Sequence, residues 1–240
     1  MGFHAKVHEL VSPSTRELVS LIAQLNDDPE YHGILVQAPV VTLERNPMPM
    51  SDLMAAIIPE KDVDGLNPAN IGRIACKSVE PLFYPCTPLG IVNILRHYEI
   101  EIKGKNVVVL GRSDIVGMPM ALMLNRLDAT VSICHSQTAD LHTVTRNADI
   151  LVVAIGSPNF VQGSWIKPGA IVVDVGINRI GSSSDGKTRI VGDVDFSTAS
   201  QVANAITPVP GGVGVMTVTM LVSNLLTAAL RSNSASLRCS

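Results

Sequence analysis

The spacing of apolar and polar positions in the first part of the chain predicts alternating strands and helices. Residues 5–10 and 33–37 are short apolar runs that predict strands, and the second ends in a polar residue. A helix is predicted to begin after Ser14, because Ser14 and Glu17 have capping-box spacing and the apolar positions after them repeat every three or four residues. A second helix is predicted over 53–58, which gives the order β-α-β-α.

The alternation becomes regular after residue 87. Thr87 and Pro88 predict a helix start, with Thr87 as the N-cap and Pro88 in the first turn. The elements predicted beyond that helix are strands 106–110, 129–134, 149–155 and 170–175 and helices 117–127 and 139–148. Strands that alternate with helices of about ten residues predict a doubly wound parallel sheet. We therefore expect an α/β fold with two domains, 1–87 and 88–215, the second Rossmann-like.

Composition and charge exclude several classes of protein. The chain has 240 residues, a net charge of −3 and only 3% aromatic residues, so it has neither the basic surface nor the stacking side chains typical of nucleic-acid binding. None of the four cysteines forms a C-x-x-C pair, so we expect free thiols, a reducing compartment and no metal site.

The C-terminal part of the chain is predicted to end in a helix over about 216–231, followed by a frayed tail at 232–240. The apolar stretch 213–230 is interrupted by hydroxyl and amide side chains, so it predicts a buried helix and not a membrane span. Residues 1–12 lack the apolar segment of a secretory signal.

Residues 106–119 have the pattern of a nucleotide-binding loop. An apolar run ends at Gly111, a polar loop follows, and Gly117 opens the next helix. A glycine at the strand end lets a phosphate approach the backbone, and a helix N-terminus supplies unpaired N–H groups. The spacing is not G-x-G-x-x-G, so an ordinary strand–helix turn is an equally good interpretation of this loop alone.

The end of the second predicted strand of this domain favours NADP over NAD. An NAD site usually has an acid about twenty residues beyond the first glycine, where it binds the ribose 2′-hydroxyl. Here that position holds His135 and Ser136, and neither would repel a 2′-phosphate. Arg112, His135 and Ser136 could receive such a phosphate, although His135 could equally be a strand-end histidine bonded to backbone.

Glycines follow three of the predicted parallel strands, at Gly111, Gly156 and Gly176. Ligands of open α/β sheets bind beyond the carboxyl ends of the strands, so three glycines at this edge predict a ligand-binding edge. Asp174 and Asp193 lie at strand ends, and we expect them to be structural.

Two further stretches are candidates for ligand contacts. Residues 58–65 carry four charges, which could bind a metal, share a proton, hydrogen-bond a donor-rich heterocycle or form a solvated surface. Residues 207–217 combine two prolines with three glycines before a helix, so they form either a surface for a small planar ligand or a structural linker.

Together these stretches resemble the methylenetetrahydrofolate dehydrogenase/cyclohydrolase family. The matching segments, in the family's order, are GILVQAP (33–39), IPEKDVDGLNP (58–68), PCTP (85–88), GRSDIVGMP (111–119), ATVSICHS (129–136), KPGAIVVDVGIN (167–178), GDVDF (192–196) and ITPVPGGVGVMT (206–217).

The resemblance implies NADP-dependent oxidation of 5,10-methylenetetrahydrofolate to the methenyl form, and hydrolysis of that product to 10-formyltetrahydrofolate. It implies a folate-binding domain over 1–87 that the C-terminal helix 216–240 completes, an NAD(P)-binding domain over 88–215, and a homodimer. The implied cofactor-binding residues are Thr87, Gly111, Arg112, Ser113, Ser136, Gly156 and Ile177. The implied substrate-binding residues are Val36, Gln37, Ala38, Asp64, Pro210, Gly211, Gly212, Val213 and Gly214. Gln37 and Asp64 are the implied catalytic residues among them, with Asp64 accepting hydrogen bonds from the pterin.

The chain also departs from the family pattern. The family carries a tyrosine and its main catalytic lysine, spaced Y-x-x-x-K, on a helix before the strand expected at 5–10, and this sequence holds no such pair. Lys6 is not its counterpart, and Val215 replaces a proline usual in the glycine loop. We therefore expect an N-terminally incomplete catalytic domain, whose alternative function is that of a catalytically impaired NADP- and folate-binding protein. The compartment, cytoplasm or mitochondrial matrix, is not readable from such a chain.

Overall fold

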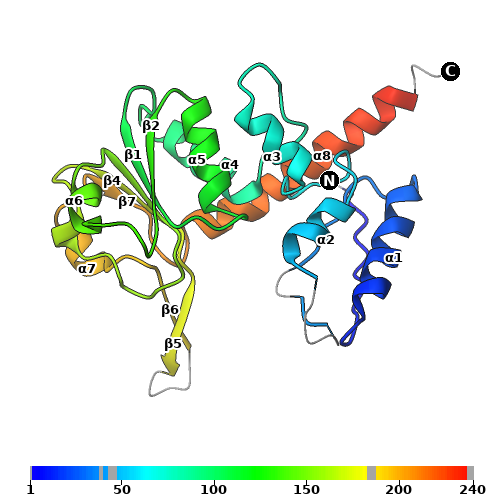
Figure 1. Ribbon diagram of the computed structural model, residues 1–240, viewed down its shortest axis with the longest axis horizontal. Helices are drawn as coiled ribbons and strands as arrows, with labels where there is room; N and C mark the ends of the chain where they lie inside the picture. The colour runs from blue at the N-terminus through cyan, green and yellow to red at the C-terminus, as the bar shows by residue number, and fades with distance from the viewer. Residues whose placement is uncertain (1, 38–39, 43–47, 183–187, 237–240) are drawn as a thin grey trace.

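The computed structural model describes residues 2–37, 40–42, 48–182 and 188–236 (Figure 1). In chain order the elements are α1 (Thr15–Asp27), α2 (Met50–Ala56), α3 (Pro68–Ala75), α4 (Cys86–His97), β1 (Asn106–Leu110), α5 (Gly117–Arg126), β2 (Thr130–Cys134), α6 (Leu141–Arg146), β3 (Ile150–Val153), the 3₁₀ turn η1 (Gly163–Trp165), β4 (Ile171–Asp174), β5 (Asn178–Ser182), β6 (Thr188–Val191), α7 (Phe196–Ala199), β7 (Ala205–Ile206) and α8 (Val213–Ser236).

The second half of the chain forms the predicted parallel sheet. Its strand order is β2-β1-β3-β4-β7, and each neighbouring pair is parallel. The strands and helices predicted between residues 106 and 175 are confirmed to within two residues at each end. β5 and β6 form a separate antiparallel pair that projects from this domain (Figure 1), and the sequence pattern did not predict it.

The central strands β1, β3 and β4 are buried on both faces, as their apolar runs require, while the edge strand β2 is largely exposed. Val107 and Val109 of β1 face a core shared with α4 and α5. Val108 and Leu110 face the opposite core, which contains residues of α6, η1 and α7. This alternation follows from the two-residue period of a strand, and it leaves the carboxyl ends of the strands free to form a site.

The first part of the chain contains helices but not the two strands predicted for it. The helix start at Ser14 is confirmed, since the Glu17 amide donates to Ser14 Oγ at 3.3 Å and the Ser14 amide to Glu17 Oε2 at 2.7 Å. Residues 5–10 are exposed coil, and 33–37 make a single parallel bridge, Ile34 to Asp62. A strand requires a hydrogen-bonded neighbour, and within the described residues these segments have little or none, so both strand predictions are wrong.

The helix at the domain boundary begins one residue before the predicted N-cap. Pro85 is the N-cap of α4, and Thr87 already lies in the first turn. The hydroxyl of Thr87 pairs instead with that of Thr217 on α8, 3.1 Å away. The prediction of Thr87 as a cap is therefore wrong, and its side chain instead joins α4 to α8.

α8 is longer and less buried than expected. It lies along α4 and continues as one long helix towards the C-terminus (Figure 1). Its described buried side chains are Val213, Asn224 and Ala228. By length and composition alone, Val213–Asn233 is long and apolar enough to cross a membrane. Its mean hydropathy is 1.8, and 17% of an 18-residue stretch within it is buried.

The outer face of α8 carries an apolar stripe, which corrects the expectation of a buried helix. The stripe consists of Val215, Val218, Val222, Leu226 and Leu230, each between 39% and 63% exposed. Their spacing of three or four residues places them on one side of the helix. We call this surface the α8 stripe.

Candidate active site

The carboxyl ends of β1, β3 and β4 form one edge, but their glycines have different roles. Gly111 is buried with φ +118°, and a Cβ there would lie 2.1 Å from the Ala154 carbonyl oxygen. A Cβ on Gly176 would meet the Asp193 carboxylate at 2.3 Å. Gly156, in contrast, is exposed at φ +66° with nothing near its Cβ position. The first two glycines permit close packing, and only the third presents open backbone to a ligand.

Ser113 closes the loop between β1 and α5. Its Oγ accepts from the amides of Val116 at 3.3 Å and Gly117 at 3.4 Å, and its carbonyl accepts from Met118. These amides at the start of α5 are therefore occupied, contrary to the expectation that the helix supplies unpaired donors. The loop is held in shape by Ser113 before any ligand arrives, which suits a preformed binding site.

Arg112 and the end of β2 lie side by side. The Gly111 amide donates to the Cys134 carbonyl at 2.9 Å, so Arg112 and His135 each follow directly on this bond. Arg112 and Ser136 are exposed, and within the described residues Arg112 has no ion pair. His135 Nδ1 accepts from the Gln137 amide at 3.2 Å, so that nitrogen is already used in a local turn. An exposed cation and an exposed hydroxyl thus follow two neighbouring strand ends at this edge.

A pair of buried carboxylates fixes the rest of this edge. Asp193, which is fully buried, accepts from the amides of Ile155, Gly156 and Ser157 at 2.7–2.9 Å and from the Asn178 side chain at 2.8 Å. The carboxylate of Asp174 accepts from three backbone amides, those of Gly176, Asp193 and Val194. Their expected structural role is thus confirmed by these contacts, and Asp193 joins the loop at Gly156 to the segment that carries Ile177.

The charged stretch 58–65 separates into structural and available groups. The Lys61 ammonium bonds the carbonyls of Leu25, Asn26 and Asp28 at 2.6–2.9 Å, and so closes the C-terminus of α1. Desolvation lowers the pKa of Lys61, and the nearby carboxylate of Asp28 opposes that shift. No group of three or more metal-ligating side chains exists within the described residues, so nothing there supports the metal-binding alternative.

Asp62 forms the turn that presents Asp64. The buried Asp62 carboxylate accepts from the amides of Gly65, Leu66 and Asn67 and from the side chain of Asn70, at 2.8–3.2 Å. Burial raises the pKa of Asp62, and these hydrogen bonds oppose that rise. Sequence reasoning missed this role, although Asn67 before Pro68 is a helix-start pattern that predicts α3.

Asp64 is half-buried, and within the described residues its carboxylate accepts from none of the turn amides that bond Asp62. Burial raises the pKa of its carboxyl, hydrogen bonding to Cys86 opposes the rise, and the charge of Asp62 adds to it. The Cys86 thiol has one proton, which can be directed at this carboxylate or at the Val63 carbonyl oxygen 3.4 Å away. Burial also raises the pKa of Cys86, so the thiol stays protonated and can donate. Asp64 is therefore an acceptor poised beside the domain boundary.

The other residues predicted to contact the substrate lie on two separate segments, 34–38 and 210–214. The bridge from Ile34 to Asp62 sets residues 34–37 beside the Asp64 turn, with Val36 half-buried and Gln37 exposed. Ala38 lies outside the described residues. A Cβ built on Gly214 would lie 3.7 Å from Ile177 Cδ1, so the glycine loop reaches the cofactor-side residue. Of that loop, Pro210 and Gly211 are exposed, Gly212 is half-buried, and Val213 is buried in the core of the sheet.

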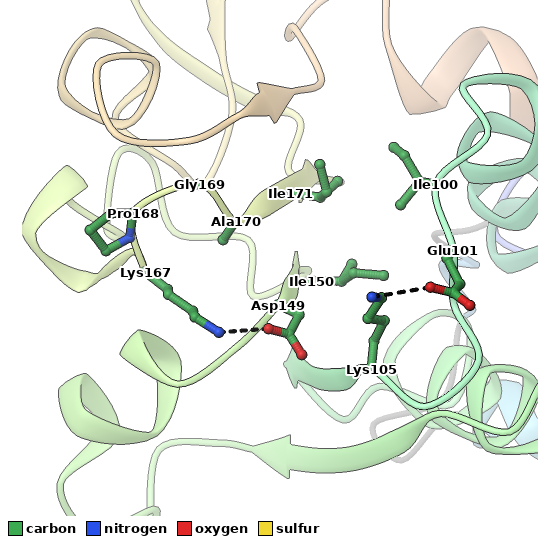
Figure 2. Close-up of a pocket in the computed structure, with 10 residues that line it drawn as sticks. All are labelled: Ile100, Glu101, Lys105, Asp149, Ile150, Lys167, Pro168, Gly169, Ala170 and Ile171. Carbon is green, nitrogen blue, oxygen red and sulfur yellow. Dashed lines mark hydrogen bonds and ion pairs between the residues drawn. The ribbon is translucent and has the colours of Figure 1, made fainter.

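A pocket of about 300 Å³ lies at the opposite, amino-terminal edge of the sheet (Figure 2). Its charged side chains are paired, Lys167 with Asp149 at 2.6 Å and Lys105 with Glu101 at 3.2 Å. Nucleotides of such sheets bind at the carboxyl ends, so this pocket is not the candidate site.

The fold and the carboxyl edge of its sheet are those of an NAD(P)-binding α/β protein. Comparison with known proteins gives its family. The chain matches the family model for the tetrahydrofolate dehydrogenase/cyclohydrolase catalytic domain over residues 1–64. It matches the model for the NAD(P)-binding domain of the same proteins over 85–233.

Relatives and solved structures agree with these models. "Bifunctional protein FolD" of Brucella ovis is 52% identical over 96% of this chain and 77% of its own length. "Bifunctional protein FolD 4, chloroplastic" of Arabidopsis thaliana is 54% identical over 91% of this chain, which spans 60% of that relative. The crystal structure of the Campylobacter jejuni FolD enzyme superposes with a TM-score of 0.82 at 47% identity, covering 91% of this chain and 74% of that one. The Trypanosoma brucei FolD, complexed with NADP cofactor and inhibitor, gives 0.83 at 43% identity, covering 91% and 73%.

The chain belongs to the tetrahydrofolate dehydrogenase/cyclohydrolase family. The predicted resemblance, the two-domain α/β class and the Rossmann-like second domain are confirmed.

Proposed function

We propose that the protein carries out the NADP-dependent oxidation of 5,10-methylenetetrahydrofolate and the hydrolysis of the product to 10-formyltetrahydrofolate. The observation that supports this proposal is a contact that joins the two candidate half-sites: Thr217, beyond the glycine loop, pairs with Thr87, which follows the Cys86 that bonds Asp64. The Asp64 carboxylate lies at one side of the domain boundary, and the Gly156–Ile177 edge reaches the glycine loop on the other. Family membership supplies the reaction, and it is a proposal because the chain spans only part of its relatives.

The residues at the sheet edge would hold the cofactor. When bound, NADP supplies the acceptor for the hydride. Arg112 and Ser136 would bind the 2′-phosphate, and this contact is our reason for preferring NADP to NAD. Gly111 and Ser113 shape the loop, and Gly156 and Ile177 face the ligand, with Thr87 at the domain border. The fit rests on the exposed Arg112 cation and the open backbone at Gly156.

The folate-side residues would orient the substrate and exclude water. Asp64 accepts the paired N–H donors of the pterin edge, which requires the ionised carboxylate. Gln37, Val36 and Ala38 would flank the pterin, and the loop over 210–214 would cover the bridging carbon. Oxidation removes a hydride from that carbon and leaves a cationic methenyl bridge. Addition of water then opens the bridge, releases a proton and leaves the formyl group on N10.

The alternative is a protein that binds NADP and folate without efficient turnover. It is favoured by one observation, the absence of a Y-x-x-x-K pair from the 240 residues. The test incubates this chain with NADP and 5,10-methylenetetrahydrofolate, and follows reduced cofactor and methenyl product. Reduced cofactor formed in an amount equal to methenyl- and 10-formyltetrahydrofolate together supports the enzyme. Binding of both ligands without product supports the alternative, and a chimaera carrying the N-terminal segment of the Brucella ovis protein should then restore product. Failure to bind either ligand contradicts both functions.

We also propose a homodimer, supported by the exposed α8 stripe, because contiguous apolar surface of this kind is typical of protein contacts. A location in the cytoplasm or an organelle matrix is proposed as well; the Arabidopsis relative is named chloroplastic. Fractionation of cells expressing the tagged protein tests that location.

A further inference from the structure

Asn224 is a buried amide on a helix whose described side chains are otherwise apolar or near the surface. It is 6% exposed and lies in the middle of α8. Burying an amide costs free energy unless its donors are bonded, so such a residue needs partners at the place where it packs. Its partners are 140 and 161 residues away in the chain, in the folate-side domain.

The two donors of this amide reach the two backbone segments that flank Asp64. Asn224 Nδ2 donates to the Val63 carbonyl at 2.8 Å and to the Tyr84 carbonyl at 3.0 Å. Val63 immediately precedes Asp64, and the Cys86 amide that follows Tyr84 donates to the Asp64 carbonyl at 3.3 Å. One side chain of α8 therefore joins both sides of the turn.

The backbone of the Asp64 turn packs closely against that of Tyr84. Gly65 has φ +74°, and a Cβ there would lie 2.6 Å from the carbonyl carbon of Tyr84. The same amide also lies 3.6 Å from Cys86 Sγ, the thiol within reach of the Asp64 carboxylate. Loss of the Asn224 donors would leave the Val63 carbonyl with only the weak thiol donor of Cys86, remove this donor from the Tyr84 carbonyl, and release the Asp64 turn from Tyr84.

We propose that Asn224 is a positioning residue of the folate site, which fixes the Asp64 carboxylate through the Val63 and Tyr84 carbonyls. Through Asn224, the C-terminal helix sets the geometry of an acid in the opposite part of the chain. Thr217 on the same helix makes a comparable contact with Thr87, so α8 touches both ligand sides of the domain border. This inference rests on the proposed function, because it takes Asp64 to be the pterin acceptor.

The test measures the affinity of the 240-residue chain for 5,10-methenyltetrahydrofolate and for NADP by titration calorimetry. Asn224→Leu keeps the branched shape, with larger methyl groups, and removes both donors; Asn224→Ser is smaller, keeps one donor and admits water. The control Thr227→Ala removes a hydroxyl of α8 that bonds only the Ser223 carbonyl of its own helix. NADP affinity, measured for each variant, reports that the cofactor domain is folded.

We expect Asn224→Leu to weaken methenyl-folate binding by about tenfold or more, with NADP affinity within about twofold of the unchanged chain. The folate affinity of Asn224→Ser should fall between those of Asn224→Leu and the unchanged chain. Thr227→Ala should bind folate as the unchanged chain does. The pH dependence of folate binding should also shift in Asn224→Leu and not in the control, since a released Asp64 is hydrated differently. A purely structural amide would lower the melting temperature without moving this pH profile.

The outcomes separate the two proposals. If both Asn224 variants bind folate as tightly as the unchanged chain, the positioning role is wrong and the proposed function stands. If Asn224→Leu loses NADP binding too, Asn224→Ser takes its place: weakened folate binding with normal NADP binding supports the positioning role, and normal folate binding contradicts it. If the unchanged chain binds NADP but no folate, or Asp64→Asn binds folate normally, the folate function at Asp64 and the role of Asn224 both fail.

Discussion

Replacement of Asp193 should release the loop at Gly156 from the segment at Asn178 while leaving the sheet folded. Asp193→Ala removes the acceptor of three loop amides and of the Asn178 side chain. An unsatisfied buried donor costs about 1–3 kcal/mol, and Gly156 is exposed enough for water to replace part of the loss. We therefore take about 1 kcal/mol for each of the three amides, or about 3 kcal/mol in total. For a chain of this size that lowers the melting temperature by about 6–12 °C.

Calorimetry with and without NADP measures both effects. NADP affinity should fall by about tenfold, because the loop at Gly156 and the segment at Ile177 no longer hold one position. Asp193→Asn keeps one carbonyl oxygen for Ile155 and Gly156, so it should lose half as much stability or less. Asp195→Asn, two residues away at the exposed start of α7, should be nearly neutral, since Asn caps a helix as well as Asp does. If Asp193→Ala melts within a degree of the unchanged chain and binds NADP normally, the carboxylate of Asp193 does not hold this edge together.

Four further perturbations have definite expected outcomes. Arg112→Ala should weaken NADP by about tenfold at low salt and leave NAD unchanged in calorimetric titrations, while the exposed Arg96→Ala changes neither; equal losses for both cofactors would remove Arg112 from the 2′-phosphate. Asp64→Asn should raise the melting temperature at neutral pH and not at low pH. The raised pKa of Asp64 makes its stabilising form the protonated one, and that stabilisation is lost as the pH rises through the folded-state pKa. Folate binding has the opposite dependence and should fall as the pH drops through that pKa; a pH-independent affinity would argue against an ionised acceptor. Gly111→Ala should destabilise the fold by more than about 2 kcal/mol in chemical unfolding, because the added methyl group meets a carbonyl at an unfavourable φ; unchanged stability would contradict the close packing of Gly111 against Ala154. Val222→Glu on the α8 stripe should shift a dimer towards monomer in light scattering, and an unchanged mass would place the contact elsewhere.

The sequence predicted the Rossmann-like domain well, because its central strands β1, β3 and β4 are apolar runs buried on both faces. Strand 106–110 and the helix beginning at Gly117 were located correctly for that reason. The first domain was predicted less well. Residues 5–10 have the composition of a strand, but strand formation depends on a partner that local sequence cannot specify.

The site was predictable where a motif carries its own chemistry and not where contacts join distant segments. The loop at Gly111 was predicted from its residues and Asp64 from the family resemblance, and their ligand roles stay predictions. Asn224 was treated as an interruption of an apolar run, since its partners lie more than a hundred residues away. Gly176 was assigned to ligand approach, although its lack of a side chain serves the packing of Asp193.

Our principal proposal is that one chain holds NADP and a reduced folate at two adjoining half-sites, one at Arg112 and the other at Asp64. Calorimetric titration of the unchanged chain, Arg112→Ala and Asp64→Ala with NADP and with 5,10-methenyltetrahydrofolate measures this arrangement. We predict that the unchanged chain binds both ligands, that Arg112→Ala loses affinity for NADP alone, and that Asp64→Ala loses affinity for the folate alone. Binding of neither ligand by the unchanged chain, or losses that fall on the opposite ligands, would contradict the two half-sites.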